Sequence, residues 1–463
     1  MLKILKFLVV TLLVISYNEG VFGQDEDALF IKKIHDEALS NGMAFPWLKE
    51  LCTNYGGRIA GSKSYLGAAT FAKDALNKID KVEGLLQDCE ASYWQRGAKE
   101  KAWIVDSKGK NIPLKVLSLG NSIATPANGL TAEVIEVRSL NEVEALGKEK
   151  IKGKIVFYNR AMDPTQLRTF SAYGGAVDQR VFGPAKAAEY VAVAALVRSM
   201  TTSSDDFPHT GVTTYRDSTY RVPGIAISTN DANLLSKKLK SGTVKVYLKT
   251  ECRTIGIRPA PTVIGEIKGS EFPDEILLIG GHLDSWDVGQ GAHDDGSGCV
   301  QAMEVLRLFS SLGYKPKRTI RAVLFSNEEN GLAGGRTYAK ISDEKKEFHL
   351  AALESDSGGF SPRGFSFDAD TSVFKTYYKN VSQWLPLLES YGLIFEKGGS
   401  GADINPLKSQ KGLLIGLRPD SQRYFDFHHT ANDRIENVNK RELELGAASM
   451  ASLIYLIDKY GIQ

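Results

Sequence analysis

The sequence predicts an α/β protein in which a mostly parallel central sheet has helices on both faces and a second, β-rich segment is inserted. Two observations predict this fold. From Val263 onward, apolar runs of strand length alternate with segments whose apolar residues recur every three or four positions. Between residues 119 and 255, short β-like runs predominate instead. Strands that alternate with helices usually form a parallel sheet that helices cover on both faces.

The composition is ordinary for a globular protein and excludes one broad class of partner. The chain has 463 residues, enough for more than one domain, and 43% of them are hydrophobic. Its net charge is only +2. This charge balance gives no reason to expect binding to nucleic acid.

The N-terminus has the features of a secretory signal peptide, which we assign to residues 1–23. Lys3 and Lys6 precede a run from Phe7 to Ile15 that is apolar except for Thr11, and Gly23 supplies a small residue at the expected cleavage position. The apolar run is shorter than the ~20 residues that a membrane-spanning helix needs. We therefore expect a protein of the secretory pathway, either secreted or lysosomal, without a membrane anchor after cleavage.

A chain in this pathway can form disulfides and carry glycans. Its four cysteines allow three complete pairings, which the sequence does not distinguish. Asn380-Val381-Ser382 is a glycosylation acceptor, so Asn380 is the predicted glycosylation site. Residues 24–44 mix charged residues with apolar ones at helical spacing, which fits either a propeptide or a first helix.

The remaining elements follow in order along the chain. A turn-rich segment at residues 54–62 leads into a helix from Tyr65 to Ile79. In the middle of the chain we expect one helix at 183–190 and strands at 132–137, 154–158, 191–197, 222–227 and 244–248. In the last part we expect strands at 276–280, 319–325, 351–353 and 413–417, and helices at 298–312, 331–339 and 442–460.

Imidazole and carboxylate groups follow four of the predicted strands in the last part of the chain. His282 and Asp284 follow the first strand, and Asp294 begins the next helix. Later strands are followed by Glu328 and Glu329, by Asp356, and by the pair His428 and His429. The carboxyl ends of parallel strands meet at one edge of a sheet, so we expect these groups to lie together. Imidazole and carboxylate donors without a thiolate suit Zn²⁺, and also Mn²⁺ or Co²⁺.

The number of donors predicts two metal ions. Two ions ~3.5–4 Å apart usually share a ligand, and a carboxylate can bridge them whereas a neutral imidazole cannot. Asp294, central in the chain order and at a helix start, is the best bridging candidate. The other ligands would be His282, Glu329, Asp356 and one histidine of the late pair. The spacing does not say which metal each of them binds.

Two further carboxylates have roles beside the metals. Glu328 is left free of metal, where a hydrolase needs a general base to take a proton from water. Asp284 lies two residues after His282 on the same side of an extended chain, so it can accept the second imidazole N–H and orient the ring. His293 is expected to point away from the metals.

The residues around these positions resemble a known family, the zinc-dependent co-catalytic exopeptidases that include bacterial leucyl aminopeptidases and glutamate carboxypeptidases. The similar stretches are Gly281–Ala292, Asp294–Gly296, Lys317–Thr319, Glu354–Asp356, Asp403–Asn405 and Phe427–His429. Gly61–Lys63 and Ser122–Pro126 are similar too, so the resemblance covers most of the mature chain. It implies the zinc exopeptidase fold with an inserted protease-associated-like domain.

The resemblance also implies how the residues divide between two Zn²⁺ ions per chain. Asp294 would bridge both ions, and Glu328 would be the general base. His282 and Asp356 would complete one metal site. Glu329 and the late histidine would complete the other.

The resemblance selects His429 as that late histidine. The family's last histidine stands four residues before an acidic residue, and His429 stands four before Asp433. His428 is therefore not the expected ligand. The family pattern also implies a cis peptide bond between Asp294 and Asp295.

We therefore expect a secreted dizinc metallo-exopeptidase that acts as a homodimer on small peptides, chiefly dipeptides with free termini. Its catalytic domain would comprise residues 45–118 and 256–463, and the inserted domain residues 119–255. The sequence does not decide among aminopeptidase, carboxypeptidase and strict dipeptidase. Two alternatives share the fold: a non-catalytic receptor-like ectodomain, which loses metal ligands, and a glutaminyl cyclase, which binds a single zinc.

Four positions depart from the family pattern, although none removes a ligand or the base. They are Asn327, Arg434, His293 and Pro406. Pro406 and Arg434 lie near segments that should line the substrate pocket. They leave the substrate preference open.

Overall fold

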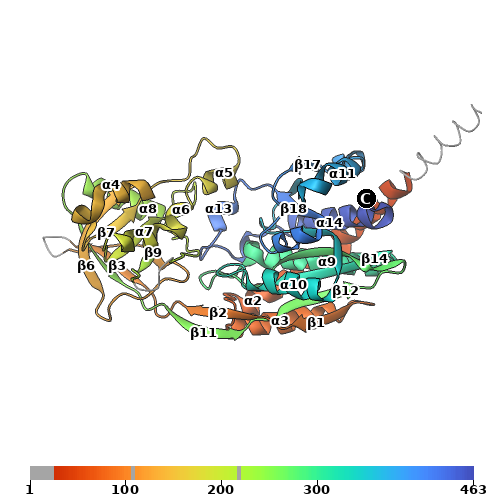
Figure 1. The fold of residues 1–463 in the computed structure, drawn as a ribbon, viewed down its shortest axis with the longest axis horizontal. Coiled ribbons are helices and arrows are strands. Elements are labelled where there is room, and N and C mark those ends of the chain that lie inside the picture. The colour runs from red at the N-terminus through yellow and green to blue at the C-terminus, as the bar shows by residue number, and fades with distance from the viewer. Residues whose placement is uncertain (1–24, 106–109, 216–219) are drawn as a thin grey trace, which may run out of the picture.

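Two eight-stranded sheets, joined by a two-stranded ribbon, organise the chain. The computed structural model describes residues 25–105, 110–215 and 220–463. The predicted signal peptide lies outside these described residues. Figure 1 shows the two sheets as separate lobes, and helices surround both of them. The predicted α/β fold is confirmed.

The larger lobe is built on a sheet that is parallel at its centre and mixed toward its edges. Its strands, in spatial order, are β1 (Glu83–Gln87), β12 (Thr262–Ile267), β14 (Arg318–Phe325), β13 (Phe272–His282), β15 (Phe348–Glu354), β18 (Leu413–Pro419), β16 (Pro362–Asp368) and β17 (Ile394–Lys397). The four central strands β14, β13, β15 and β18 are parallel to one another. Antiparallel pairs β1–β12, β12–β14 and β16–β18 flank them.

Helices cover both faces of this sheet. They are α2 (Ala44–Tyr55), α3 (Lys63–Leu76), α9 (Ser297–Ser311), α10 (Ala333–Lys345), α11 (Thr371–Ser382), α12 (Leu385–Glu389) and α14 (Lys440–Tyr460). Successive side chains of β13 point to opposite faces, as the pleat requires. Leu277 and Ile279 pack in the core that contains α9 and α14, whereas Ile276 and Leu278 pack in a second core with Tyr338 of α10.

The smaller lobe is richer in helix than the sequence predicted. Its sheet has the order β4 (Ile112–Pro113), β3 (Lys101–Val105), β10 (Lys245–Lys249), β6 (Leu130–Val137), β7 (Ile155–Tyr158), β8 (Ala194–Arg198), β9 (Gly224–Ile227) and β5 (Val116–Ser118). Strands β6 to β9 are parallel. The described helices are α4 (Leu140–Ile151), α5 (Thr169–Gly174), α6 (Asp178–Val181), α7 (Gly183–Glu189) and α8 (Thr229–Leu239). Strands β3 to β5 precede residue 119, so this sheet begins earlier than the predicted insertion.

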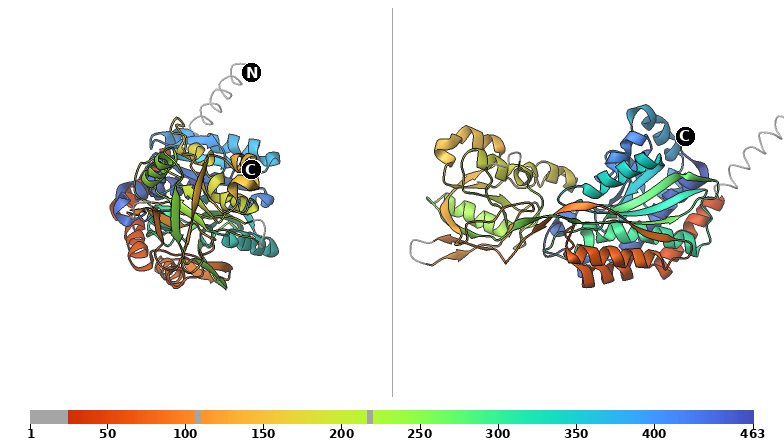
Figure 2. Two further views of the ribbon diagram at one scale, coloured as in Figure 1. Left: turned by 90° about the vertical axis from the view of Figure 1, so that its left-hand side faces the viewer. Right: turned by 60° about the horizontal axis from the view of Figure 1, so that its bottom comes forward.

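The two lobes are connected by a long antiparallel ribbon of β2 (Glu90–Gln95) and β11 (Arg253–Pro259). Figures 1 and 2 show this ribbon running along one side of the molecule from lobe to lobe. The short helix α13 (Tyr424–Phe427) lies between the lobes in Figure 1. The chain therefore returns from the large lobe to contact the small one just before His428 and His429.

The segment at 24–44 forms a helix over residues 25–41 whose apolar face is part of the main core. Ile31, Ile34 and Ala38 are fully buried there. Asp27, also buried, accepts hydrogen bonds from the hydroxyls of Tyr455 and Tyr460 on α14. These contacts favour a first helix over a removable propeptide.

The four cysteines are all buried and unpaired in the structure. Asn380 lies on α11, is partly exposed, and donates its side-chain amide to the carbonyl of Ile462 at 3.1 Å. Glycosylation there stays a prediction. Among the described residues, no helix combines the length and the apolar character that crossing a bilayer would require.

Candidate metal centre

The site begins where β13 ends. His282 is the last residue of this strand, and the following loop leads to the π-turn Ala292–Gly296 and then to α9. The fully buried Arg58 fixes this loop, because its guanidinium donates to the main-chain carbonyls of Leu283, Gln290 and Gly291 at 2.8, 2.6 and 2.9 Å. A strand end and an anchored loop thus hold the first donors in place.

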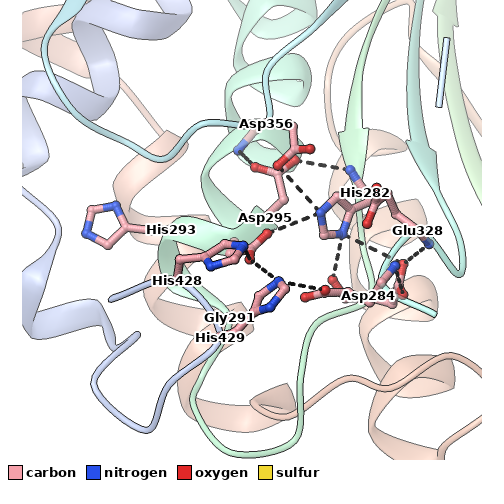
Figure 3. Close-up of polar contacts among 12 residues, drawn as sticks. His282, Asp284, Gly291, His293, Asp295, Glu328, Asp356, His428 and His429 are labelled. Carbon is pink, nitrogen blue, oxygen red and sulfur yellow. Dashed lines mark hydrogen bonds and ion pairs between the residues drawn. The ribbon is translucent and has the colours of Figure 1, made fainter. Parts of the chain in front are cut away.

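Asp294 lies between two groups of donors. Its Oδ1 is 3.3 Å from Nε2 of His282, which is in turn 3.6 Å from Oδ1 of Asp356. Its Oδ2 is 3.2 Å from Nε2 of His429, which is in turn 3.0 Å from Oε2 of Glu329. Figure 3 shows His282 with Asp356 on one side of the cluster and His429 on the other. One carboxylate oxygen faces each group, the arrangement that a bridging ligand requires.

The donors suit metal ions. Asp294 Oδ2 and Glu329 Oε1 are buried and accept no hydrogen bond. Buried polar atoms normally have a hydrogen-bond partner or a bound ion, so these two oxygens indicate that a partner binds here. Carboxylates and imidazoles without thiolates are ligands of Zn²⁺ and related divalent ions. The residues present therefore fit two divalent cations that share Asp294.

Two neighbours also come within reach of the donors, and their other contacts argue against a role as ligands. Donor atoms of Asp295 lie within 4.8 Å of those of His282 and Asp356, and those of His428 within 4.8 Å of Asp294 and His429. However, Asp295 already accepts the backbone N–H groups of His282 and Gly298 at 3.1 and 3.0 Å.

His428 is farther from the acidic groups than His429. Its Nε2 is 3.9 Å from Asp294 Oδ2, and no contact of His428 with Glu329 is present among the described residues. Its ring stacks on His429 with centroids 3.5 Å apart and packs among Tyr173, Tyr424 and Phe425. Distance therefore favours His429 as the ligand.

The acidic surroundings shift the pKa values of the cluster. Burial, together with the negative charges of Asp356 and Glu329, raises the pKa of Glu328 well above its usual range. Burial and the charge of Asp294 raise the pKa of Glu329 to about 7. Burial opposes protonation of His429, but Glu329 and Asp294 outweigh it and raise its pKa to about 10. Cations bound here would offset this excess of negative charge.

Asp284 is near His282, but its contact differs from the predicted one. The main-chain carbonyl of Asp284 is 3.0 Å from Nδ1 of His282, whereas its carboxylate is 3.8 Å away. The carboxylate instead accepts the backbone N–H groups of Glu328 and Glu329 at 3.0 and 3.3 Å. The extended chain after β13 turns the side chain toward the neighbouring strand end, so Asp284 orients the imidazole by its backbone and the Glu328 loop by its side chain.

Asp433, four residues after His429, holds the bridging residue. Its carboxylate accepts the backbone N–H groups of His293 and Asp294 at 2.7 and 3.2 Å. The peptide bond between Asp294 and Asp295 is cis, as the family pattern implied.

His293 points away from the cluster in Figure 3. It stacks on Phe360 and contacts the carbonyl of Asn437. It is therefore a packing residue, as expected.

The metal centre opens into a hollow of about 440 Å³ between the two lobes. The large lobe contributes the donors and Glu328. The small lobe contributes Asn121, Phe170, Tyr173 and Arg180. Pro406 and Arg434 do not line this hollow, and Arg434 is exposed and pairs with Glu436 instead. The small lobe is thus part of the site.

Sequence reasoning missed the lining residues of the small lobe. Arg180 is on α6, a helix of four residues, so no periodic pattern or motif marks it. Asn121 exchanges hydrogen bonds with Asn330, two residues after Glu328, across the lobe boundary. Only the packing of the two lobes brings these residues to the metal centre.

Comparison with known proteins shows the family to which the chain belongs. Residues 262–454 match the sequence model of peptidase family M28. This range contains every predicted ligand and Glu328. Carboxypeptidase Q from Bos taurus is 33% identical to the chain over 410 residues, which are 88% of this chain and 83% of that protein.

Solved structures show the same relation. The peptidase M28 precursor from Shewanella amazonensis SB2B is 32% identical, with a TM-score of 0.87 over 94% of this chain and 97% of that one. A zinc aminopeptidase from Bacillus subtilis, 19% identical, shares the fold with a TM-score of 0.58 over 89% of this chain and 94% of that one. The chain therefore belongs to peptidase family M28, together with the carboxypeptidase Q proteins, and the predicted metallopeptidase class is confirmed.

Proposed function

We propose that this peptidase is a secreted exopeptidase with two Zn²⁺ ions per chain that hydrolyses small peptides, chiefly dipeptides with free termini. The observation that carries the proposal is the position of Asp294 between two donor groups. His282 and Asp356 would complete one metal site, and Glu329 and His429 the other. The zinc aminopeptidase that shares the fold supports zinc as the metal.

A zinc pair supplies a Lewis acid for the scissile carbonyl and lowers the pKa of water. Glu328 would accept the proton of the attacking water and donate it to the leaving amine. The hydrogen bond from its backbone N–H to the Asp284 carboxylate, 3.0 Å long, holds the Glu328 loop next to the residues that would bind the metals. Residues of the small lobe line one side of the hollow.

Replacing Glu328 by Gln tests the base. We expect kcat to fall by about 10²–10⁴-fold, because the proton acceptor is lost. Zinc content by mass spectrometry should stay at two per chain. Glu344→Gln, on the exposed face of α10, is the matched control. Normal activity of the Glu328 variant would refute the role of Glu328 as the base. A content of one zinc per chain in the parent protein would favour a glutaminyl cyclase.

Arg180 supports a substrate with a free carboxylate. It is only 5% exposed and lines the hollow beside the metal centre, with Nη1 3.4 Å from Nδ1 of His429. Its Nε is buried without an acceptor, and no carboxylate forms an ion pair with it among the described residues. A buried, unpaired guanidinium is costly, and a planar carboxylate is its best partner. The C-terminal carboxylate of a dipeptide would fill this role.

Paired substrates test this assignment. Arg180→Met should lower kcat/KM for dipeptides with a free carboxylate by about 10–100-fold, because a charge-assisted hydrogen bond is lost. The same variant should leave the slower cleavage of dipeptide amides unchanged. An equal loss for both substrates would mean that Arg180 only supports the fold. A panel of peptides with blocked N-termini would then show directly from which terminus the enzyme removes residues.

The remaining parts of the proposal rest on the sequence. The N-terminal segment supports secretion or delivery to the lysosome. The resemblance supports a homodimer and an inserted domain, expected at 119–255, to whose sheet the preceding strands β3 to β5 also belong.

A further inference from the structure

The small lobe has a second hollow, and none of its lining residues belongs to the metal centre. Its volume is about 530 Å³. Arg138 directly follows β6, Arg160 follows β7, and Arg198 ends β8, so the carboxyl ends of three parallel strands form one wall. Lys237 of α8 and Lys240, which directly follows this helix, also line the hollow. Ligands of parallel sheets usually bind at this edge.

The positive charge of this hollow is not balanced. Of the five basic residues, only Arg160 forms an ion pair, with Asp178, within the part of the chain that the structure describes. One lining residue, Asp163, is acidic, and it is exposed. Glu136 lies nearby, but its carboxylate accepts hydrogen bonds from Asn159 and Ser236. Four cations, from the strand ends and from the end of α8, therefore line the hollow without an ion pair to a carboxylate among the described residues.

Arg198 is held in position by neutral groups. Its Nη1 donates to the side-chain oxygens of Asn159 and Asn233 at 3.2 and 2.8 Å. Its Nε is buried without an acceptor. Burial also lowers the pKa of Arg198, and the charge of Glu136 only partly opposes this effect. Two amides thus fix the guanidinium while its charge stays uncompensated.

We propose that this hollow binds the phosphate group of a small phosphate monoester. A phosphate monoester carries close to two negative charges at neutral pH and several acceptor oxygens. Arginine recognises such oxygens with paired N–H groups, and lysine adds point charge. The volume suits a ligand of small-molecule size. The site is separate from the peptidase centre and does not depend on its chemistry.

Calorimetric titration of the purified full-length protein tests the proposal, with glucose 6-phosphate as the probe. We expect saturable binding at low ionic strength, weaker binding at high salt, and none with glucose. Lys237→Gln should weaken the binding on the order of tenfold, because one charge-assisted contact is lost. Lys238→Gln is the matched control. It alters the next residue of α8, which is also exposed but does not line the hollow, and should leave binding unchanged.

Arg198→Met provides a second variant and should also weaken binding. Inorganic phosphate in place of the ester shows whether the phosphate alone is bound, and we expect it to bind with the same dependence on Lys237. Three results would overturn the proposal. The first is the absence of saturable binding. The second is an equal weakening of binding by Lys237→Gln and Lys238→Gln. The third is binding that neither Lys237→Gln nor Arg198→Met changes, because the anion would then bind elsewhere, such as at the metal centre.

Discussion

At the scale of single residues, Glu444 on α14 gives the protein a pH-dependent stability. Its side chain is 1% exposed, and Oε1 accepts the backbone N–H of Phe45 at 3.0 Å. Burial and the charge of Glu304 raise its pKa from the ordinary value of 4.5 to about 7. The folded state therefore favours the protonated form. Its contribution to stability is full below pH 4.5 and is lost as the pH rises through 7.

We therefore expect Glu444→Gln to raise the free energy of unfolding at pH 7.5 by on the order of 2 kcal/mol, because the buried charge is removed. At pH 4.5 the variant and the parent should be equally stable. Urea denaturation at the two pH values measures both quantities. Glu436→Gln, at an exposed site, is the control. A gain in stability that is equal at both pH values would contradict the assigned titration.

The donor residues could be predicted from the sequence, whereas their partners could not. His282, Asp294, Glu329 and Asp356 follow strands or begin a helix, so the parallel topology alone brings them together. The prediction that the carboxylate of Asp284 accepts the N–H of His282 was wrong in detail. Strand alternation predicts the face of the strand on which a side chain lies, but it does not predict the rotamer of that side chain. The sequence showed no sign of Arg180, since its neighbours in space are distant in the chain.

At the scale of elements, the first helix at 25–41 is tied to the last helix. Asp27 forms an ion pair with Lys459 at 2.5 Å in addition to its contacts with two tyrosine hydroxyls. We expect Asp27→Ala to lower the free energy of unfolding by about 2 kcal/mol, because these buried donors lose their acceptor. Chemical denaturation at pH 7 would measure the change.

The matched control for this helix is Asp25→Ala, two residues earlier and exposed. It should change stability by less than about 0.5 kcal/mol. If both variants behave alike, the helix is not anchored through Asp27. The buried apolar face of Ile31, Ile34 and Ala38 would then be its main attachment to the core.

The predicted elements of both lobes are present, but the small lobe also contains helices α4, α5, α6 and α8, which were not predicted. Strands β13, β14 and β18 and helices α9 and α14 carry long apolar patterns, which the sequence reveals. In the small lobe, α5 and α6 have six and four residues, too few for a helical period to be visible. Helix α4 contains Gly147 in a non-helical conformation, so its pattern is interrupted. The helix packs against β6 and α7, and packing of this kind supplies most of the stability of a short helix.

At the scale of the whole molecule, the two lobes meet at the metal centre. The backbone N–H of Thr210 in the small lobe donates to the carbonyl of His429 at 3.0 Å, and Nδ1 of His429 lies 3.3 Å from the carbonyl of Thr210. The small lobe therefore orients a proposed metal ligand as well as presenting Arg180. Substrate binding and metal binding should respond together when this contact is disturbed.

Gly211 is the position at which that coupling can be measured. A β-carbon there would lie 2.5 Å from Cζ of Arg180 and 2.7 Å from Nδ1 of His429, so one or both side chains must move. We expect Gly211→Ala to lower kcat/KM for a dipeptide by about 100-fold, because small displacements of catalytic groups are costly. Zinc should also be lost to a chelator more readily than in the parent.

The control for this substitution is Gly242→Ala. Gly242 also has a positive φ, 147° against 128° for Gly211, but has no atom within 4 Å of the added carbon. Both variants therefore carry similar backbone strain, and only Gly211→Ala introduces the collision. If the two variants lose stability equally and both retain parental activity and zinc affinity, the small lobe does not position His429. If Gly211→Ala loses activity toward dipeptides with a free carboxylate but keeps its zinc, Arg180 alone has moved.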